Sequence, residues 1–452
     1  MVLIGATRRS SPARPDRHQE FQPLGDLGRR RRGKSLPPGL SGYPIQSIGS
    51  LGMSERAYDE RRLRDFLAGR ARGFSRRELL ALTAAAALLP ASPAAAASPI
   101  VKPLPDDLFR PLGTNAETRW SALKDQGYYV PVDRFFVRNH TVTPTIDAGS
   151  WQLEISGSGT KSAFFGLEDI KRLPSVTVPV AIECAGNGRS YYTSQQGQTV
   201  SGTAWTLGAI GVGKWKGVKL STVLRKAGIS RHAVDVQPIG LDPNFVSGGV
   251  DLGPVRRPFP VRKAFDDVIL AYELNGEPLP PDHGFPVRVV VPHWIGISSI
   301  KWVGRIEVSA EPLFSPWNTQ FYRLFGPDFP AEGRPFDRQS IKSAFELDPG
   351  ATFPAGVRTR LTGRSWSADG PIREVRISTD GGTTWRRARP YGATPGGVWQ
   401  RWEYDWTPAA GEHVLLARAT DVRGNTQPDV ARFNTLGYLF DAAVRVPVTA
   451  VG

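Results

Sequence analysis

Cys184 is the only cysteine of the 452-residue chain, and it stands where an apolar run enters a glycine-rich loop, residues 180–190 (VAIECAGNGRS). Gly186 and Gly188 allow the backbone to approach a ligand closely. A thiolate that is the single protein ligand suits a soft metal whose other ligands come from an organic cofactor. Two alternatives stay open: a small buried hydrophobic side chain, and a nucleophile, although no histidine is near in the sequence. With one cysteine, neither an internal disulfide nor a multi-cysteine zinc or iron–sulfur site can form.

Short apolar segments separated by Gly- and Pro-rich loops must position this cysteine. Strands are predicted at 151–155, 176–182 and 287–291. Helices are predicted at 166–173 and at 221–227, the second opened by a serine cap at Ser221. Many short strands with few helices indicate an α+β domain over residues 98–330, whose function is carried by loops.

The pattern changes after residues 327–337 (PDFPAEGRPFD), which read as a linker. Strand-like segments at 373–378, 402–406 and 413–418 follow, with a turn signal at 380–382. About 110 residues of this kind favour a second domain, residues 338–452, built as a β-sandwich of the immunoglobulin type.

The N-terminal segment 1–97 reads as an extension followed by an export signal. Arg76 and Arg77 precede the apolar run Leu79–Leu89, whose 11 residues are too few for the ~20 of a membrane span. A charged region, a short apolar run and small residues up to Ala97 are typical of a twin-arginine signal peptide, with a short buried helix or an uncleaved anchor as the alternatives. Export signals stand near the start of a chain, so Met53 is the expected start.

Export and charge both bear on function. An unpaired thiol is a liability in an oxidising compartment unless it is occupied, and the twin-arginine route carries folded proteins that already hold cofactors. We therefore expect a periplasmic or otherwise exported protein. The chain has a net charge of +15, but residues 1–97 hold 17 Lys and Arg against 8 Asp and Glu, which leaves +6 for the rest. This weak excess argues against nucleic-acid binding.

The cysteine loop resembles the molybdenum-binding loop of the sulfite oxidase family, with Cys-Ala-Gly-Asn followed by an arginine at the fifth position after the cysteine. Three further stretches carry the resemblance in the same order: 135–140 (FFVRNH), 271–288 (AYELNGEP leading into DHGFPVR) and 301–305 (KWVGR). The resemblance covers about residues 128–438. It implies a mixed α/β molybdopterin-binding domain, an immunoglobulin-like dimerisation domain, and molybdopterin with molybdenum as cofactor.

The resemblance also implies a role for individual residues. Cys184 would be the thiolate on the metal, and Asp242 would touch the pterin. Residues that would hold the cofactor and its phosphate are Phe136, Val137, Arg138, Asn139, His140, His283, Arg288, Ser299, Ile300 and Lys301. A buried phosphate needs several cationic or N–H donors, which this set supplies. Taken alone, a lysine or arginine is more often a surface cation, and a lone histidine is more often structural.

The substrate pocket implied by the resemblance contains Arg138, Arg189, Trp205 and Tyr322. Two guanidinium groups would attract a small dianion and orient it by paired hydrogen bonds. Two departures concern its charge: Gly188 stands where the family often has a second loop arginine, and Leu436 stands where vertebrate members have an arginine.

The implied reaction is oxygen-atom transfer that oxidises sulfite to sulfate. The chain has no Cys-x-x-Cys-His haem motif, so electrons would pass to an external acceptor such as a cytochrome, or to dioxygen. A homodimer without a stable membrane span is expected. The alternatives are a reductase of S- or N-oxides on the same molybdenum core, and an exported anion-binding protein without catalysis.

Overall fold

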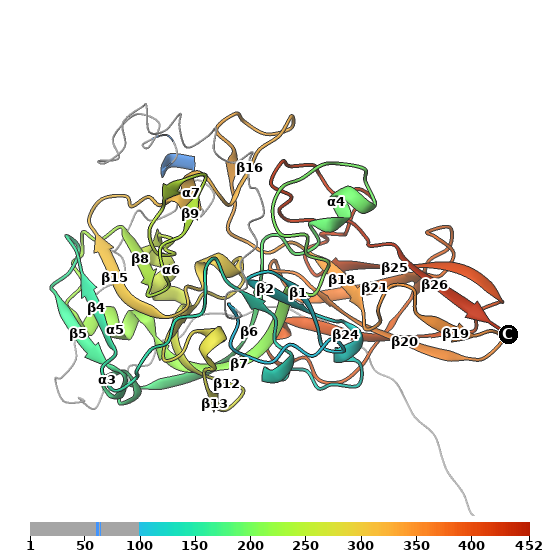
Figure 1. Ribbon diagram of the computed structural model, residues 1–452, viewed down its shortest axis with the longest axis horizontal. Helices are drawn as coiled ribbons and strands as arrows, with labels where there is room; N and C mark the ends of the chain where they lie inside the picture. Colours follow the sequence, from blue (N-terminus) through green and yellow to red (C-terminus); the bar gives the residue numbers. More distant parts are fainter. Residues whose placement is uncertain (1–59, 63, 65–98) are drawn as a thin grey trace, which may run out of the picture. The chain divides into compact units, whose positions relative to one another are not determined.

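The computed structural model describes residues 60–62, 64 and 99–452 (Figure 1). All the sheets described here belong to one compact unit of the chain. The predicted signal with Arg76 and Arg77 and the expected start at Met53 lie outside the described residues. Within the described part of the chain, no helix combines the length and hydropathy needed to cross a bilayer.

A five-stranded sheet in the order β11-β8-β15-β4-β5 forms one half of the first domain. The side chains on its buried face form one hydrophobic cluster with those of helices α3, α5 and α6. Trp151, Val236 and Ile306 belong to this cluster. The elements are β4 (Gln152–Ser156), β5 (Ala163–Gly166), α3 (Leu167–Lys171), α5 (Leu220–Lys226), β8 (Asp235–Gly240), β11 (Phe259–Pro260), α6 (Val261–Asp266) and β15 (Val303–Ser309).

A second sheet, in the order β13-β12-β7-β6 with β14 also paired to β12, carries the cysteine loop. Its strands are β6 (Ser175–Glu183), β7 (Ile210–Lys219), β12 (Ile269–Leu274), β13 (Glu277–Pro278) and β14 (Arg288–Val290). The antiparallel pair β6–β7 runs in unbroken register from Ser175 opposite Val218 to Glu183 opposite Ile210. This long pairing holds the strand end that presents Cys184.

Smaller elements complete the first domain. One three-stranded sheet contains β1 (Phe109–Leu112), β2 (Asn115–Thr118) and β3 (Val137–Arg138). Two hairpins consist of β9 (Val246–Ser247) with β10 (Val250–Asp251), and β16 (Arg323–Leu324) with β17 (Arg334–Pro335). The remaining helices are α4 (Ser190–Ser194), α7 (Pro316–Thr319) and the 3-10 helices η3 (Ser121–Leu123), η4 (Val132–Arg134), η5 (Pro281–His283) and η6 (Gly296–Ser298).

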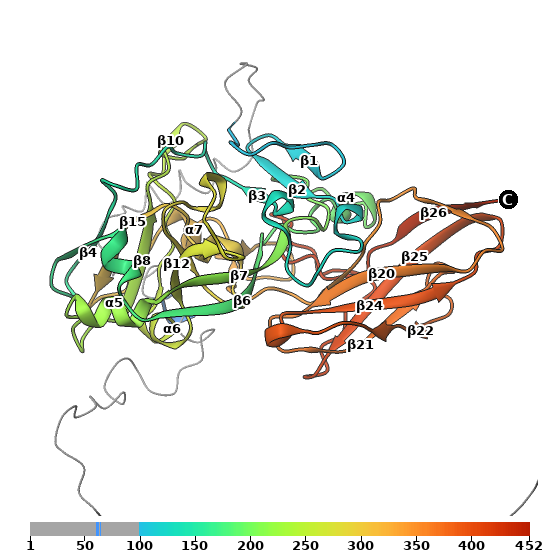
Figure 2. The ribbon, with the colours of Figure 1, turned by 90° about the horizontal axis from the view of Figure 1, so that it is seen from below.

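The C-terminal part contains two sheets, drawn orange to red in Figure 2. One has the order β18-β20-β24-β23 and the other β19-β26-β25-β21-β22. Their facing side chains form a separate cluster that includes Phe345, Trp402, Ile377 and Leu415, so the arrangement is sandwich-like. Bounds are β18 (Lys342–Phe345), β19 (Thr352–Pro354), β20 (Thr359–Trp366), β21 (Ile372–Ser378), β22 (Arg386–Arg387), β23 (Arg389–Pro390), η7 (Pro395–Gly397), β24 (Trp399–Trp406), β25 (Gly411–Asp421) and β26 (Val446–Val451).

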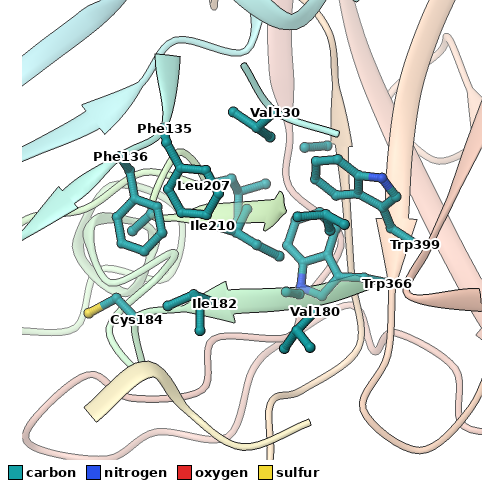
Figure 3. Packing of buried hydrophobic residues seen from close by; sticks show 14 of the residues in the cluster. Val130, Phe135, Phe136, Val180, Ile182, Cys184, Leu207, Ile210, Trp366 and Trp399 are labelled. Carbon is teal, nitrogen blue, oxygen red and sulfur yellow. The ribbon is translucent and has the colours of Figure 1, made fainter. Parts of the chain in front are cut away.

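One hydrophobic cluster belongs to both domains (Figure 3). Phe136, Ile182 and Cys184 of the first domain share it with Trp366 and Trp399 of the second. Trp366 also stacks on Trp120 with ring centroids 5.8 Å apart. The cysteine loop is therefore packed partly by residues of the C-terminal sheets.

The α+β class and its sandwich-like C-terminal sheets are confirmed, and each named strand prediction overlaps an observed strand. The cap at Ser221 is wrong. Strand β7 runs into α5 without a loop, Lys219 takes the N-cap position without a side-chain cap, and Ser221 is buried inside the first turn. The expected linker 327–337 holds strand β17, which pairs with β16, so this segment is structured.

Candidate active site

Cys184 opens into a cavity that is lined by residues from many elements. The thiol side chain is free and 8% exposed, and its backbone N–H donates to the carbonyl oxygen of Ala209, 2.9 Å away. The lining residues are Phe135, Phe136, Arg138, Asn139, His140, Ile182, Cys184, Ala185, Asp242, Val255, Asp282, His283, Arg288, Gly296, Ile297, Ser299, Ile300, Lys301, Trp302 and Tyr322.

Two glycines give the cysteine loop its shape. Gly188 has φ +94°, and a Cβ there would lie 3.0 Å from Cβ of Phe440. A Cβ on Gly186 would lie 2.6 Å from the guanidinium carbon of Arg189. The left-handed backbone at Gly188 therefore favours glycine, whereas a side chain at Gly186 would require the Arg189 guanidinium to move.

Three basic side chains, those of Lys301, Arg288 and His283, line this cavity; Arg288 and His283 are buried and Lys301 is half-buried. Nζ of Lys301 donates to the carbonyl oxygen of Asp282 (2.8 Å) and to Oδ1 of Asn139. The guanidinium of Arg288 donates to the carbonyl oxygens of His283 (3.0 Å) and Ser299 (2.8 Å). Nε2 of His283 is buried and has no hydrogen-bond partner among the described residues.

Burial sets the pKa shifts of this basic group, and Asp282 and Asp242 oppose the shift at Lys301. Burial lowers the pKa of Lys301 and of His283 well below their usual values, and neighbouring cations lower both further. Burial alone lowers the pKa of Arg288 to about 9. A bound anion would favour the charged forms and accept from the orphaned Nε2. The residues present therefore fit the phosphate of a pterin cofactor.

Residues 136–140 contribute four of their five side chains to the cavity. Phe136, Arg138, Asn139 and His140 line it, whereas Val137 is buried in a different cluster with Phe109 and Ala116. Because successive side chains of a strand point to opposite faces, β3 cannot present both Val137 and Arg138 to one cavity. We therefore find the side chain of Val137 outside the predicted site.

His140 is neutral in this environment. Its Nε2 accepts from Nε1 of Trp317 (3.0 Å) and lies 3.0 Å from a guanidinium nitrogen of Arg138. Burial, with Arg138 and Lys301 nearby, lowers the pKa of His140 well below its usual value. An unprotonated Nε2 that accepts these hydrogen bonds leaves the ring proton on Nδ1.

Tyr322 lies on the cavity wall in a left-handed backbone conformation, with φ 56°. Its ring stacks on Tyr438 with centroids 5.2 Å apart, and the guanidinium of Arg257 lies 5.5 Å from its centroid. Burial raises the pKa of Tyr322, so its hydroxyl keeps the proton and can donate it in a hydrogen bond.

Arg189 and Trp205 are not among the cavity-lining residues. Arg189 donates from Nε to the carbonyl oxygen of Leu436 and from Nη1 to that of Thr203, both at 2.9 Å, and its guanidinium lies 5.2 Å from the ring centroid of Tyr438. Trp205 is fully buried against Phe136. Arg138 is thus the one predicted substrate arginine that the structure brings to the cavity.

Several residues around the site were missed from the sequence. Asp282 accepts from the backbone N–H groups of Val101 and Lys102, and its position inside the 271–288 motif was a usable signal. Trp302 lines the cavity, and Nζ of Lys301 lies 4.0 Å from the centroid of its ring. Trp317 is distant in sequence from the histidine it contacts, so no local pattern marks it.

The cavity contains one thiol, that of Cys184. No group of three or more His, Cys, Asp or Glu that could hold a metal occurs in the described ranges. The thiol of Cys184 stands beside a cationic phosphate-type site. This donor set suits a metal that is carried by an organic cofactor.

Comparisons with known proteins agree with this chemistry. The sequence model of the oxidoreductase molybdopterin binding domain matches residues 140–317. Human mitochondrial sulfite oxidase is 34% identical over 403 residues, which cover 82% of this chain and 72% of that protein. The Drosophila melanogaster enzyme is 34% identical over 367 residues, with 75% and 62% covered.

A solved structure has a similar fold. The sulfane dehydrogenase SoxCD from Paracoccus pantotrophus superposes with a TM-score of 0.64 at 27% identity, covering 78% of this chain and 92% of that chain. The predicted family, enzyme class and molybdenum–molybdopterin cofactor are therefore confirmed. The chain belongs to the sulfite oxidase family of molybdopterin-dependent oxidoreductases.

Proposed function

We propose that this enzyme oxidises sulfite to sulfate by transfer of one oxygen atom and passes two electrons to an external acceptor. The overall reaction takes one water and releases two protons with the two electrons. The convergence of Cys184, Arg138 and Tyr322 on one cavity, beside the cationic group of Lys301, Arg288 and His283, carries the proposal.

The bound molybdenum cofactor would supply the transferable oxygen and take up the electrons. Cys184 would be its protein thiolate. Lys301, Arg288 and His283 would hold its phosphate, with Asp242, Asn139 and the segment Ser299–Ile300 against the pterin.

Arg138 and Tyr322 would bind the substrate in this cavity. The guanidinium of Arg138 would attract and orient the oxyanion, since it is the cation that lines the cavity next to His140. The protonated hydroxyl of Tyr322 would donate to an oxygen of the anion. We assign Arg189 and Trp205 to support of the cysteine loop, because their side chains are engaged outside the cavity.

We further propose that the enzyme is exported by the twin-arginine route, acts in the periplasm, and delivers electrons to a cytochrome. The signal-like sequence around Arg76 and Arg77 supports export. We also propose an immunoglobulin-like topology for the C-terminal sheets and a homodimer formed through them, as the family resemblance implies.

The test is to measure molybdenum and pterin per chain in purified protein, and then sulfite-dependent reduction of ferricyanide. We expect near-stoichiometric cofactor and turnover in the wild type. Cys184→Ser should keep the pterin but lose most turnover, because the cationic group holds the cofactor whereas the sulfur tunes the metal. Protein without molybdenum would support an anion-binding function, and cofactor-loaded protein that reduces methyl sulfoxides but ignores sulfite would support a reductase.

A further inference from the structure

Glu183 stands one residue before Cys184 and its carboxylate is enclosed by polar contacts. It is 1% exposed. Oε1 accepts from Nζ of Lys342 (2.8 Å) and from Nδ2 of Asn187 (3.0 Å), and Oε2 accepts from Nε1 of Trp366 (3.1 Å). A buried carboxylate with a cation and two further donors is well satisfied.

Two of these three donors come from the C-terminal sheets. Lys342 is the first residue of β18 and Trp366 the last of β20, and the two are register partners. Lys342 is 2% exposed and also donates to Oγ of Ser340 (2.7 Å). The carboxylate next to the predicted metal thiolate is therefore anchored in the other domain.

The third donor, Asn187, ties the carboxylate to the cysteine loop itself. Its Oδ1 accepts from the N–H of Ala209 (3.0 Å), whose carbonyl oxygen accepts from the N–H of Cys184. The backbone N–H of Asn187 donates to the carbonyl oxygen of Cys184 (2.9 Å). Glu183 thus connects the C-terminal sheets to both ends of the turn that holds the thiol.

The far side of the same loop is also held by the C-terminal part of the chain. The N–H of Leu439 donates to the carbonyl oxygen of Ala185 (2.9 Å), directly after the cysteine. Phe440 fills the space beside Gly188. The loop therefore has C-terminal contacts before and after Cys184.

We propose that Glu183 and Lys342 are positioning residues, through which the C-terminal sheets hold the Cys184 loop in the conformation that presents its thiolate to the cofactor. Removal of Lys342 leaves an uncompensated buried charge, and the loop must open to hydrate it. Removal of both charges together avoids that penalty. The effect on turnover rests on the proposed sulfite oxidation, whereas the effect on the loop does not.

The experiment compares holoenzyme of Lys342→Met, Glu183→Gln and the double variant with wild type. Amide hydrogen exchange of a peptide covering residues 183–192 reports loop opening, and alkylation of the single cysteine by iodoacetamide reports release of its sulfur from the cofactor metal. In Lys342→Met we expect both to be faster by roughly tenfold or more, as for a local opening made easier. The same variant should lose about tenfold in kcat while KM for sulfite stays within about twofold.

The double variant should recover part of each loss, because it restores neutrality. The matched control is Glu346→Gln, which breaks the pair Glu346–Arg364 (2.6 Å) in the same sheet. This pair is equally buried, but Arg364 donates to the carbonyl oxygens of Tyr128 and Leu123 instead of contacting the cysteine loop. Glu346→Gln should lower thermal stability without faster exchange in 183–192.

Two outcomes would overturn the proposal: wild-type exchange and alkylation in Lys342→Met, or an equal loop effect in Glu346→Gln. If Lys342→Met yields no folded protein, Trp366→Phe removes the indole donor to Glu183 but keeps an aromatic ring against Trp120, and it should change the same readouts in the same direction. A wild type without sulfite turnover would contradict the proposed function and leave the exchange and alkylation comparison intact.

Discussion

Nε1 of Trp317 donates a 3.0 Å hydrogen bond to Nε2 of His140, and the rings meet edge to face with centroids 5.7 Å apart. Trp317 is fully buried in α7, whereas His140 lines the active-site cavity. The indole therefore fixes the histidine tautomer, and it orients the ring that contacts Arg138.

Trp317→Phe should lower kcat/KM for sulfite by about 2–10-fold, the worth of one neutral hydrogen bond. The loss should fall mainly on KM, because His140 would no longer hold the guanidinium of Arg138 in place. Trp294→Phe is the control: Trp294 is equally buried, and its Nε1 has no hydrogen-bond partner among the described residues. Equal kinetic losses in both variants would show that packing, not the hydrogen bond, is responsible.

Lys301→Met should weaken cofactor retention. A buried charged hydrogen bond contributes about 1.5–3 kcal/mol, so affinity for the cofactor should fall roughly 10–150-fold. Pterin and molybdenum per chain after exhaustive dialysis measure this. Lys263→Met is the matched control, since Lys263 is buried but pairs with Asp267 (2.8 Å) and does not line the cavity. Full cofactor retention in Lys301→Met would remove this residue from the phosphate site.

Asp242 should make folding stability depend on pH in a defined direction. Burial raises its pKa to about 6, above the ordinary value of 3.8. The folded state therefore holds the proton more tightly, so the stabilising contribution is complete below about pH 3.8 and is lost as pH rises through about 6.

The difference in unfolding free energy between wild type and Asp242→Asn measures this contribution. It should shift against the wild type by about 2 kcal/mol between pH 4.5 and pH 7.5. Denaturant titrations of the two proteins at equal cofactor content provide the values. Parallel pH profiles would show that this carboxyl is not desolvated.

The sequence motifs predicted which segments meet at the cavity, although Cys184 and Lys301 are far apart in the chain. The family resemblance accounts for this success, because the residues alone indicate the glycine turn after Cys184 but do not mark His283, Arg288 and Lys301 as one group. Strand alternation alone places the side chains of Val137 and Arg138 on opposite faces, which agrees with the structure.

The direction of the Arg189 side chain was not predictable from the sequence. It is set by distant contacts: the carbonyl oxygen of Leu436, and the room left by Gly202 and Gly437, where a Cβ would lie 2.9 Å and 2.7 Å from its side-chain atoms. The pairing of Glu183 with Lys342 likewise joins two domains and leaves no local pattern.

The proposed twin-arginine export requires the pair Arg76 and Arg77. Replacing both with lysine should retain the protein in the cytoplasm, because the export receptor reads the arginine pair itself. Cell fractionation followed by immunoblotting gives the result. Replacing Arg61 and Arg64, which lie outside the arginine pair and the apolar run, is the control and should leave export intact. Normal periplasmic accumulation of the Arg76→Lys/Arg77→Lys variant would contradict the proposal.

Substitutions of Arg138 and Arg189 should have different effects, because the two side chains lie in different surroundings. Arg138 lines the cavity, so Arg138→Gln should lower kcat/KM for sulfite by roughly 10–150-fold, with part of the loss in KM and with weaker competitive inhibition by sulfate. Arg189→Gln removes two hydrogen bonds to backbone carbonyls, so it should lower the melting temperature while the sulfate inhibition constant stays close to wild type. Steady-state kinetics with sulfate, together with thermal unfolding, distinguish the two. If Arg189→Gln weakens sulfate inhibition as much as Arg138→Gln does, the Arg189 guanidinium reaches the substrate during turnover, and its place beside Leu436 is a resting position.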